Sequence, residues 1–357
     1  KMLGLTPDEP RTDCFGLPET HNVIKAMNCV LNELAPSAVL VAEVNATKDV
    51  IATYYGDGDE AHIAYEFPIA PLSLFTVLTG DATAVHQWCA ERLAHPDRIG
   101  LAFTASHDGV GVLSMRDVPP LADGESALDF LARTLVERGA GINFKSVVHK
   151  GGPTKVPYEA CITWAQAILS VDERERLLGG DASEVEIERW ADRFFASHSF
   201  VLGAPHCVPA DYLGAIVGLF NDEELALRSN HHRNKNRGVL NGALFAETLS
   251  SDAPYGKFVR RLWRKKHRAL EVRRAHRAFS PYARCRVGEV STGDGSPGVF
   301  SVYREYDGDR VLAVTNVTGD SLSLELSDEA RAAEDLLEGG VLEGARLGPW
   351  QVAWLAL

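Results

Sequence analysis

The stretch GLAFTASHDGVGVLS, residues 100–114, decides the fold of this 357-residue chain. Its apolar run predicts a buried strand over 100–106, which stops at a serine, a histidine and an aspartate (106–108) and is followed by a glycine-rich segment (109–111). Aspartate and glycine favour turns, so a simple turn explains the pattern. Active sites of α/β barrels are assembled at strand ends, so the same residues also suit a catalytic site.

Strand-like and helix-like segments alternate around this stretch. β-Branched runs of strand length indicate buried strands, and apolar residues spaced near 3.6 indicate amphipathic helices. The predicted elements are helices over 18–36, 82–94 and 124–139 and strands over 38–45, 60–72 and 100–106. Repeated strand–helix units predict an α/β fold with a parallel sheet covered by helices.

The rest of the chain contains a less regular block and then a block of alternating apolar and polar residues. The predicted elements are a strand over 158–169, a helix over 185–205, a loop over 220–238 and a basic helix over about 253–278. Residues 298–326 then alternate apolar and polar side chains about Asp-Gly and Gly-Asp turns, which is typical of antiparallel β-structure. We therefore expect a boundary near 279–283, between an α/β part and a small β domain.

Composition narrows the class of protein. A hydrophobic fraction of 45% and a charged fraction of 24% are ordinary for a globular chain. The formal net charge of −13 argues against nucleic acid or an anionic membrane as the main partner, because both are polyanions. The six cysteines form no CxxC pair, so we expect neither a zinc site nor a disulfide framework, and a reducing cytoplasm is the natural compartment. Adjacent His231 and His232 lack the spacing of metal ligands on a helix, so no metal is expected.

Two acids stand where predicted buried strands end. They are Glu43, in VLVAEVN (39–45), and Asp108, next to His107. Either acid alone could simply cap a loop. Together they suggest glycoside chemistry with retention, which needs one carboxylate as nucleophile and one carboxylic acid that protonates the leaving oxygen.

The ordered series of motifs resembles glycoside hydrolase family 13, the α-amylase superfamily, and within it the sucrose phosphorylase subfamily. The matching stretches are CFGLPETH (14–21), VLVAEVN (39–45), YYGDGDEAHIAYEFPIAPL (54–72), TASHDGVGV (104–112) and RRAHRAFSP (273–281). The resemblance implies the second half, strands 5–8, of a (β/α)8 TIM barrel over residues 1–278. It further implies a small antiparallel β-sandwich domain over residues 279–357.

The same resemblance assigns roles to single residues. Glu43 matches the general acid/base, Asp108 the carboxylate that stabilises the transition state, and His107 the histidine that hydrogen-bonds the donor sugar. Arg233 and Arg237 match arginines of a loop that contacts donor or acceptor, although a solvated basic loop is an equally simple reading for Arg237.

The acceptor region departs from the subfamily pattern. Glu159 falls where relatives have Gln or Glu, near the acceptor and phosphate site, whereas we expect Lys155 to be solvated. Departures from the subfamily pattern after Glu43 (44–48) and at Tyr158-Glu159-Ala160-Cys161 leave the identity of the acceptor open.

The resemblance assigns the nucleophile to an aspartate just upstream of Lys1, so we expect the chain to be a fragment that is unstable and inactive alone. The expected activity of the parent is that of a retaining α-glucoside phosphorylase acting on a small sugar, with inorganic phosphate as co-substrate and no cofactor. Sucrose, sucrose 6-phosphate, glucosylglycerol and glucosylglycerate are all possible donors. A hydrolase or transglucosidase on the same site, and a non-catalytic sugar-binding or structural relative, stay open as alternatives, as does the oligomeric state.

Overall fold

The computed structural model describes residues 16–46, 48–149 and 152–357. It contains a four-stranded sheet in the order β1-β2-β3-β7, and every neighbouring pair is parallel. Its strands are β1 (Val41–Ala42), β2 (Ile63–Glu66), β3 (Ile99–Ala102) and β7 (Cys207–Pro209). Because the strands are parallel, the segments that follow them all leave from one edge of the sheet. The predicted α/β fold with a parallel sheet is confirmed.

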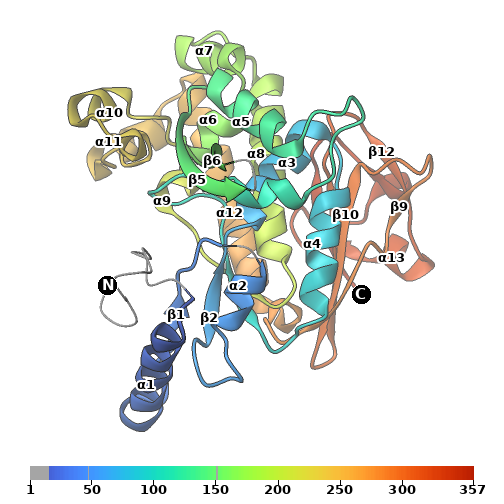
Figure 1. Cartoon of the computed structure of the whole chain (residues 1–357). Coiled ribbons are helices and arrows are strands. Elements are labelled where there is room, and N and C mark those ends of the chain that lie inside the picture. The colour runs from blue at the N-terminus through green and yellow to red at the C-terminus, as the bar shows by residue number, and fades with distance from the viewer. Residues whose placement is uncertain (1–15, 47, 150–151) are drawn as a thin grey trace.

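Helices connect and cover these strands (Figure 1). The α-helices are α1 (Pro18–Leu34), α2 (Lys48–Thr53), α3 (Ile69–Thr79), α4 (Thr83–Leu93), α5 (Ala127–Glu137), α6 (Trp164–Ile168), α7 (Val171–Gly179), α8 (Glu184–Gly203), α9 (Leu213–Ile216), α10 (Glu223–Ser229), α11 (Gly242–Ser250), α12 (Pro254–Ala275) and α13 (Asp328–Ala332). Short 3-10 helices are η1 (Leu113–Asp117), η2 (His232–Asn236), η3 (Arg277–Phe279) and η4 (Glu343–Ala345).

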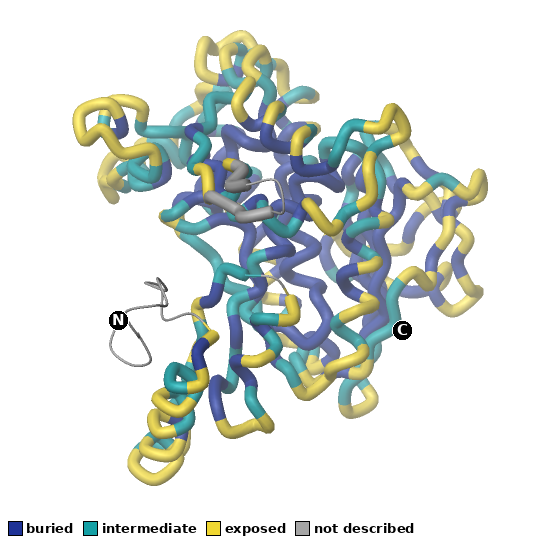
Figure 2. Tube along the Cα trace, viewed as in Figure 1, coloured by how far each residue is buried: buried dark blue, intermediate teal, exposed yellow. Residues whose placement is uncertain are grey.

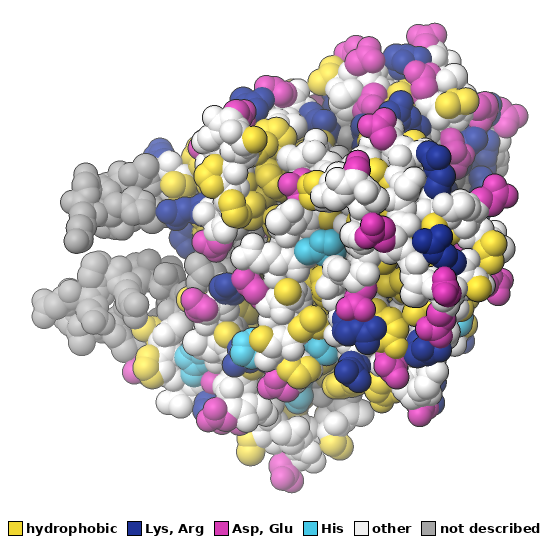
Figure 3. All heavy atoms as spheres, turned by 90° about the vertical axis from the view of Figure 1, so that its right-hand side faces the viewer, with side chains coloured by type: hydrophobic (Ala, Val, Ile, Leu, Met, Phe, Trp, Pro, Cys, Tyr) yellow, Lys and Arg dark blue, Asp and Glu magenta, His cyan; other side chains and the backbone are white. Residues whose placement is uncertain are grey.

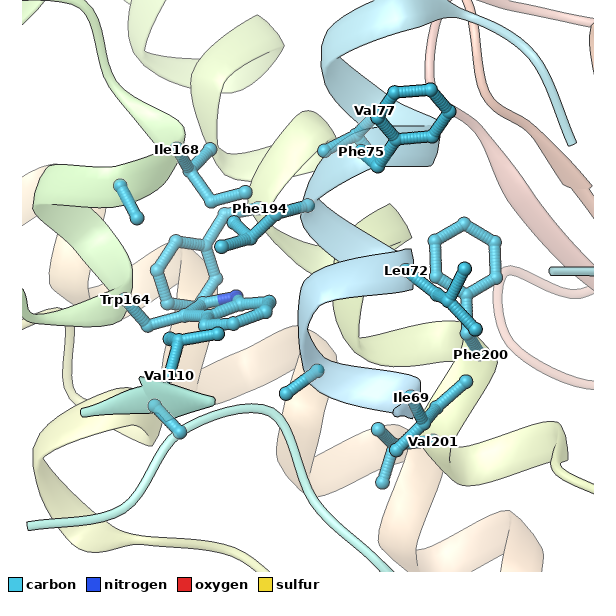
Figure 4. Packing of buried hydrophobic residues seen from close by; sticks show 14 of the residues in the cluster. Ile69, Leu72, Phe75, Val77, Val110, Trp164, Ile168, Phe194, Phe200 and Val201 are labelled. Carbon is cyan, nitrogen blue, oxygen red and sulfur yellow. The ribbon is translucent and has the colours of Figure 1, made fainter. Parts of the chain in front are cut away.

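Helix α3 lies at the heart of the core. It is apolar all round, as expected of a helix buried on every side, and residues 69–77 are all buried. Figure 4 shows its side chains between those of α6 and α8, with Leu72 near Phe200 and Ile69 near Val201. The helix ends at Gly80, whose φ of +73° is a left-handed conformation that glycine adopts without strain. Residues 60–72 were expected to form one strand, so the strand prediction is wrong for its second part.

A β-hairpin stands above the strand ends. Strand β5 (Gly141–His149) pairs antiparallel with β6 (Gly152–Cys161), and β6 pairs with the short β4 (Val110–Gly111). The strand expected over 158–169 is therefore wrong after Cys161, because α6 begins at Trp164. A continuous apolar run is compatible with either a buried strand or a buried helix, which explains the error.

Two antiparallel sheets make up the C-terminal part. The first has the order β13-β15-β11-β10-β8 and the second β14-β12-β9. Their strands are β8 (Arg284–Val287), β9 (Ser291–Thr292), β10 (Val299–Tyr306), β11 (Asp309–Asn316), β12 (Leu322–Glu325), β13 (Glu334–Asp335), β14 (Arg346–Leu347) and β15 (Val352–Ala356). The turn between β10 and β11 is Asp307-Gly308, with φ of +53° and +81° at the two residues, as in the primed hairpin turns that Asp-Gly favours.

Burial is uneven over the molecule. In Figure 2 α3 is mostly dark blue, whereas α1 carries mostly exposed and half-buried residues. The exposed side of α1 includes Val23, Met27, Val30 and Leu34, and Val41 on the edge strand β1 is exposed as well. Apolar side chains at this spacing form one stripe along a helix. Both α1 and β1 thus expose apolar side chains.

The remaining surface is ordinary. Lys, Arg, Asp and Glu side chains are interspersed over the face shown in Figure 3. Within the described ranges, no helix combines the length and hydropathy needed to cross a membrane, and no group of three or more His, Cys, Asp or Glu could hold a metal ion. The five cysteines among these residues are free thiols.

Candidate functional site

Asp108 is held in a tight turn after β3. Its backbone N–H donates to Ser106 Oγ at 3.1 Å, and Ser106 bridges to Gly109. Gly109 has a φ of +104°, and a Cβ there would lie 2.5 Å from the carbonyl oxygen of Ala160. Only glycine fits this backbone and this close approach. The segment is therefore a turn, and the turn also places Asp108.

Two arginines from the η2 region converge on that carboxylate. Arg233 Nη1 donates to Asp108 Oδ2 at 3.1 Å, and Arg237 Nη2 donates to Asp108 Oδ1 at 2.7 Å. Arg237 Nε also donates to the carbonyl oxygen of His107 at 3.2 Å. Segments more than 120 residues apart in the sequence thereby form one charged cluster.

Glu159 lies beneath Arg233 and is 4% exposed. The guanidinium donates through Nη2 to Glu159 Oε1 and through Nε to Oε2, both at 2.9 Å. Asn143 Nδ2 donates to Oε2 at 2.7 Å. A buried carboxylate needs such partners, because desolvation alone would strongly disfavour its charge. The Glu159 hydrogen bond is also the main cause that raises the pKa of Arg233 above its usual value.

Cys161 lies next to Glu159 and Asn143. Its Sγ lies 3.4 Å from Asn143 Nδ2 and 3.7 Å from Glu159 Oε2. Burial, and then the charge of Glu159, raise the pKa of the Cys161 thiol to about 12. The thiol therefore stays protonated and unreactive at neutral pH.

His107 is the most open member of the group. Its side chain is 61% exposed, and Nε2 lies 3.4 Å from Asp108 Oδ1. The ring faces Tyr212 at a centroid distance of 6.5 Å. Tyr212 in turn donates its hydroxyl to the carbonyl oxygen of Asn236 at 2.9 Å, which anchors the loop that carries Arg237.

Glu43 stands apart from the cluster. It follows β1 directly and is exposed, and its side chain has no hydrogen bond or ion pair among the described residues. The loop after it does reach the Asp108 segment, because a Cβ on Gly111 would lie 3.2 Å from Asn45 Nδ2. The structure thus gathers Asp108, His107, Arg233, Arg237 and Glu159 into one site and leaves Glu43 at the same sheet edge without direct contact. Lys155 is exposed on β6.

Asn143 and Tyr212 are the members that sequence reasoning missed. Asn143 lies opposite Glu159 in the β5–β6 ladder, and Tyr212 follows β7. A strand of three residues such as β7 carries too little pattern to be predicted. The pairing partner of Asn143 depends on hairpin register, for which no local signal exists.

A cavity of about 620 Å³ lies between α2, α4 and η1. Its wall includes the buried pair Glu66 and Arg92, whose Oε1 and Nη1 lie 2.5 Å apart. Burial outweighs this pairing and raises the pKa of Glu66, and burial together with the charge of Glu66 raises the pKa of Tyr55 to about 12. None of the charged cluster around Asp108 lines this cavity.

Known proteins resemble the chain along nearly its whole length. Glucosylglycerate phosphorylase of Escherichia coli (strain K12) is 29% identical over 368 residues, covering 99% of this chain and 59% of the relative. Glucosylglycerate phosphorylase of Allomeiothermus silvanus is 30% identical over 355 residues, covering 99% of this chain and 58% of the relative. The chain therefore spans somewhat under three-fifths of the length of these curated relatives. No protein-family model matches the sequence.

Solved structures agree on the fold. The structure of sucrose 6F-phosphate phosphorylase from Thermoanaerobacter thermosaccharolyticum matches with a TM-score of 0.59 at 16% identity, covering 84% of this chain and 51% of that one. Identity this low speaks for the fold alone, and that fold is the one of the TIM-barrel enzymes of family 13. The two glucosylglycerate phosphorylases, which match 99% of the chain, are members of glycoside hydrolase family 13, the α-amylase superfamily, which the sequence motifs resemble.

Proposed function

We propose that the intact protein is a retaining α-glucoside phosphorylase, which transfers a glucosyl group from a small α-glucoside to inorganic phosphate and releases glucose 1-phosphate. The observation that carries the proposal is the placement of Asp108. Two arginines hold this carboxylate at the carboxyl edge of a parallel sheet, with His107 open to solvent beside it. This is where an α/β enzyme binds substrate, and relatives that cover 99% of the chain are phosphorylases.

The proposed chemistry divides the work between two acids of this chain. Glu43, as a carboxylic acid, protonates the leaving oxygen as the glycosidic bond breaks and a nucleophilic carboxylate forms the glucosyl-enzyme. Glu43, now a carboxylate, then accepts a proton from phosphate, whose oxygen displaces the enzyme carboxylate. Asp108 stabilises the positive charge that develops on the sugar, while His107, Arg233, Arg237 and Glu159 shape the sugar and phosphate sites. Phosphate is a co-substrate, and no further cofactor or metal is invoked.

The proposed architecture is the second half of a (β/α)8 barrel, strands 5–8, over residues 1–278, with a small β-sandwich domain over 279–357. Among residues 16–46, 48–149 and 152–357, no strand pairs with the far side of β1, and α1 exposes an apolar stripe. Both features support the proposal, because a closed barrel leaves neither an unpaired strand edge nor bare apolar surface there. In the proposed barrel the nucleophile stands on a strand outside this chain. The 357-residue chain alone is accordingly proposed to be unstable and inactive, and sustained turnover by it would overturn that statement.

The donor is best tested directly. Glucosylglycerate is favoured, because it is named in the two relatives covering 99% of the chain, and sucrose, sucrose 6-phosphate and glucosylglycerol are the competitors. The intact protein is incubated with each donor, with and without phosphate, and glucose 1-phosphate is measured. We expect one donor to give glucose 1-phosphate only when phosphate is present. Donor consumption that is indifferent to phosphate would reject phosphorolysis in favour of a hydrolase or transglucosidase, and no consumption at all would favour a non-catalytic relative.

The cellular setting is part of the proposal. A net charge of −13 and free thiols at the described cysteines support a cytoplasmic enzyme with small sugars and phosphate as its partners, rather than nucleic acid or a membrane.

A further inference from the structure

Asn143 lies at an irregular point of the β5–β6 ladder. It pairs with Glu159, but the next residue, Phe144, pairs with Pro157, so Tyr158 is an extra residue without a partner in β5. A bulge of this kind re-aims the side chains next to it. Residues directly opposite in an antiparallel pair point to the same face, so the bulge and register together bring the Asn143 amide against the Glu159 carboxylate.

The contacts of Glu159 leave it no direct role toward a ligand. Oε1 accepts from Arg233 at 2.9 Å, and Oε2 accepts from Arg233 at 2.9 Å and from Asn143 at 2.7 Å. With 4% of the residue exposed, the carboxylate faces protein on all sides. A two-point contact between guanidinium and carboxylate fixes the plane of the arginine as well as its position.

Arg233, held in this way, also contacts Asp108. Its remaining Nη1 donates to Asp108 Oδ2 at 3.1 Å. Arg237, on the other oxygen, donates to the His107 carbonyl and to Asn234 Oδ1 in η2, and among the described residues it has no hydrogen bond to β5 or β6. Arg233 is therefore the arginine that connects Asp108 to the buried Glu159 of the β5–β6 hairpin.

We propose that Asn143, Glu159 and Arg233 form one positioning unit for Asp108, in which Asn143 is a positioning residue that fixes Glu159, and Glu159 fixes Arg233. This inference rests on the proposed function and deepens it. It assigns Glu159 to the support of Arg233 rather than to contact with substrate. The unit acts as a whole: without the Asn143 amide, Oε2 loses a donor, and the carboxylate that sets the plane of the guanidinium is itself held less firmly.

Substitutions at Asn143 separate positioning from packing. Asn143→Ala removes the donor, and Asn143→Asp keeps the shape but puts an acceptor against Glu159 Oε2. We expect kcat/KM for phosphorolysis to fall about tenfold in Asn143→Ala and further in Asn143→Asp. If Asn143 only fills space, the isosteric Asp variant is the milder one, and that order would overturn the proposal. Lys145→Ala, at an exposed position of the same strand, is the control and should leave kcat/KM unchanged.

A double-mutant cycle tests whether Asn143 acts through Arg233. In the Arg233→Gln background, Asn143→Ala should change kcat/KM by less than twofold, since the group it supports is already gone. Effects that multiply as for independent sites contradict a shared unit. Thermal unfolding of each variant checks that the native fold is retained. If the wild-type protein consumes donor without phosphate, the proposed phosphorolysis fails. The same cycle is then measured by donor consumption, so failure of the positioning unit is distinguishable from failure of phosphorolysis.

Discussion

Asp108 and Arg237 are joined by a hydrogen bond of 2.7 Å between Oδ1 and Nη2, while Oδ2 of the same carboxylate accepts from Arg233. Each oxygen thus has one arginine donor. A carboxylate offers about four acceptor positions in all, so Asp108 can be held by protein and still accept hydroxyl groups of a sugar. This arrangement makes the charge of Asp108, rather than its shape, the property to test.

Asp108→Asn preserves the shape of the side chain and removes its charge. We expect kcat to fall by about 10²–10³-fold, the usual scale for losing one preorganised electrostatic group. The measurement is steady-state kinetics of the intact protein with its donor. Asp57→Asn, at an exposed turn, serves as the matched control and should retain full activity. A purely loop-capping role for Asp108 would give a nearly active Asp108→Asn enzyme.

Glu43→Gln removes the proposed proton donor. General acid–base catalysis contributes about 10²–10⁴-fold, so a loss in that range is expected with a donor whose leaving group needs protonation. The rate of the bond-breaking step should fall far less with 4-nitrophenyl α-glucoside, because that leaving group departs without a proton. Burst kinetics with both donors distinguish the cases, with Glu33→Gln on the exposed side of α1 as control. Equal losses for both donors would argue against Glu43 as the acid.

His86 makes stability depend on pH. It lies on α4 against β10, accepts from the Ser301 backbone N–H at 3.0 Å through Nε2, and stacks on Phe300. Burial lowers its pKa from 6.5 to about 4. Between these values the unfolded chain binds more protons than the folded one, so the free energy of unfolding falls as pH drops from 6.5 toward 4 and levels off below.

The size of that effect is on the order of 3 kcal/mol, at about 1.4 kcal/mol for each pKa unit. Urea unfolding at a series of pH values measures it. His86→Gln keeps an acceptor for Ser301 but does not titrate, so it should flatten the acid side of the profile, whereas His95→Gln at an exposed position should not. An unchanged slope in His86→Gln would refute this source of the pH dependence.

Arg304 joins the two parts of the molecule. It is fully buried in β10 and donates to the carbonyl oxygens of Gly203 and Ala204 at the end of α8, and to those of Ala278 and Ser280. Arg304→Met would leave these carbonyls without that donor, and each buried unpaired group costs about 1–3 kcal/mol. We expect the free energy of unfolding to fall by at least about 3 kcal/mol in urea titrations. Arg284→Met, exposed on β8, should change it by less than about 0.5 kcal/mol.

The local sequence pattern was enough to predict the amphipathic helices. The helices expected over 82–94, 124–139 and 253–278 appear as α4, α5 and α12, because an apolar face repeated at 3.6 residues identifies both the element and its buried side. The same reasoning failed for α3 and α6, whose sequences are apolar on all sides. A segment buried all round carries no periodicity, so its conformation is chosen by the space left between neighbours.

By itself, the sequence determined the α/β class and the antiparallel C-terminal part, because these depend on composition and periodicity. Its short motifs named Asp108, Arg233 and Glu159 as candidate site residues. Only the tertiary structure decided how those charges meet. Asn143 reaches Glu159 through a bulged hairpin register, and Arg233 reaches both Glu159 and Asp108 across more than 70 residues of sequence. Strand register and the path of a loop are set by packing over the whole fold, and no local stretch of residues encodes them.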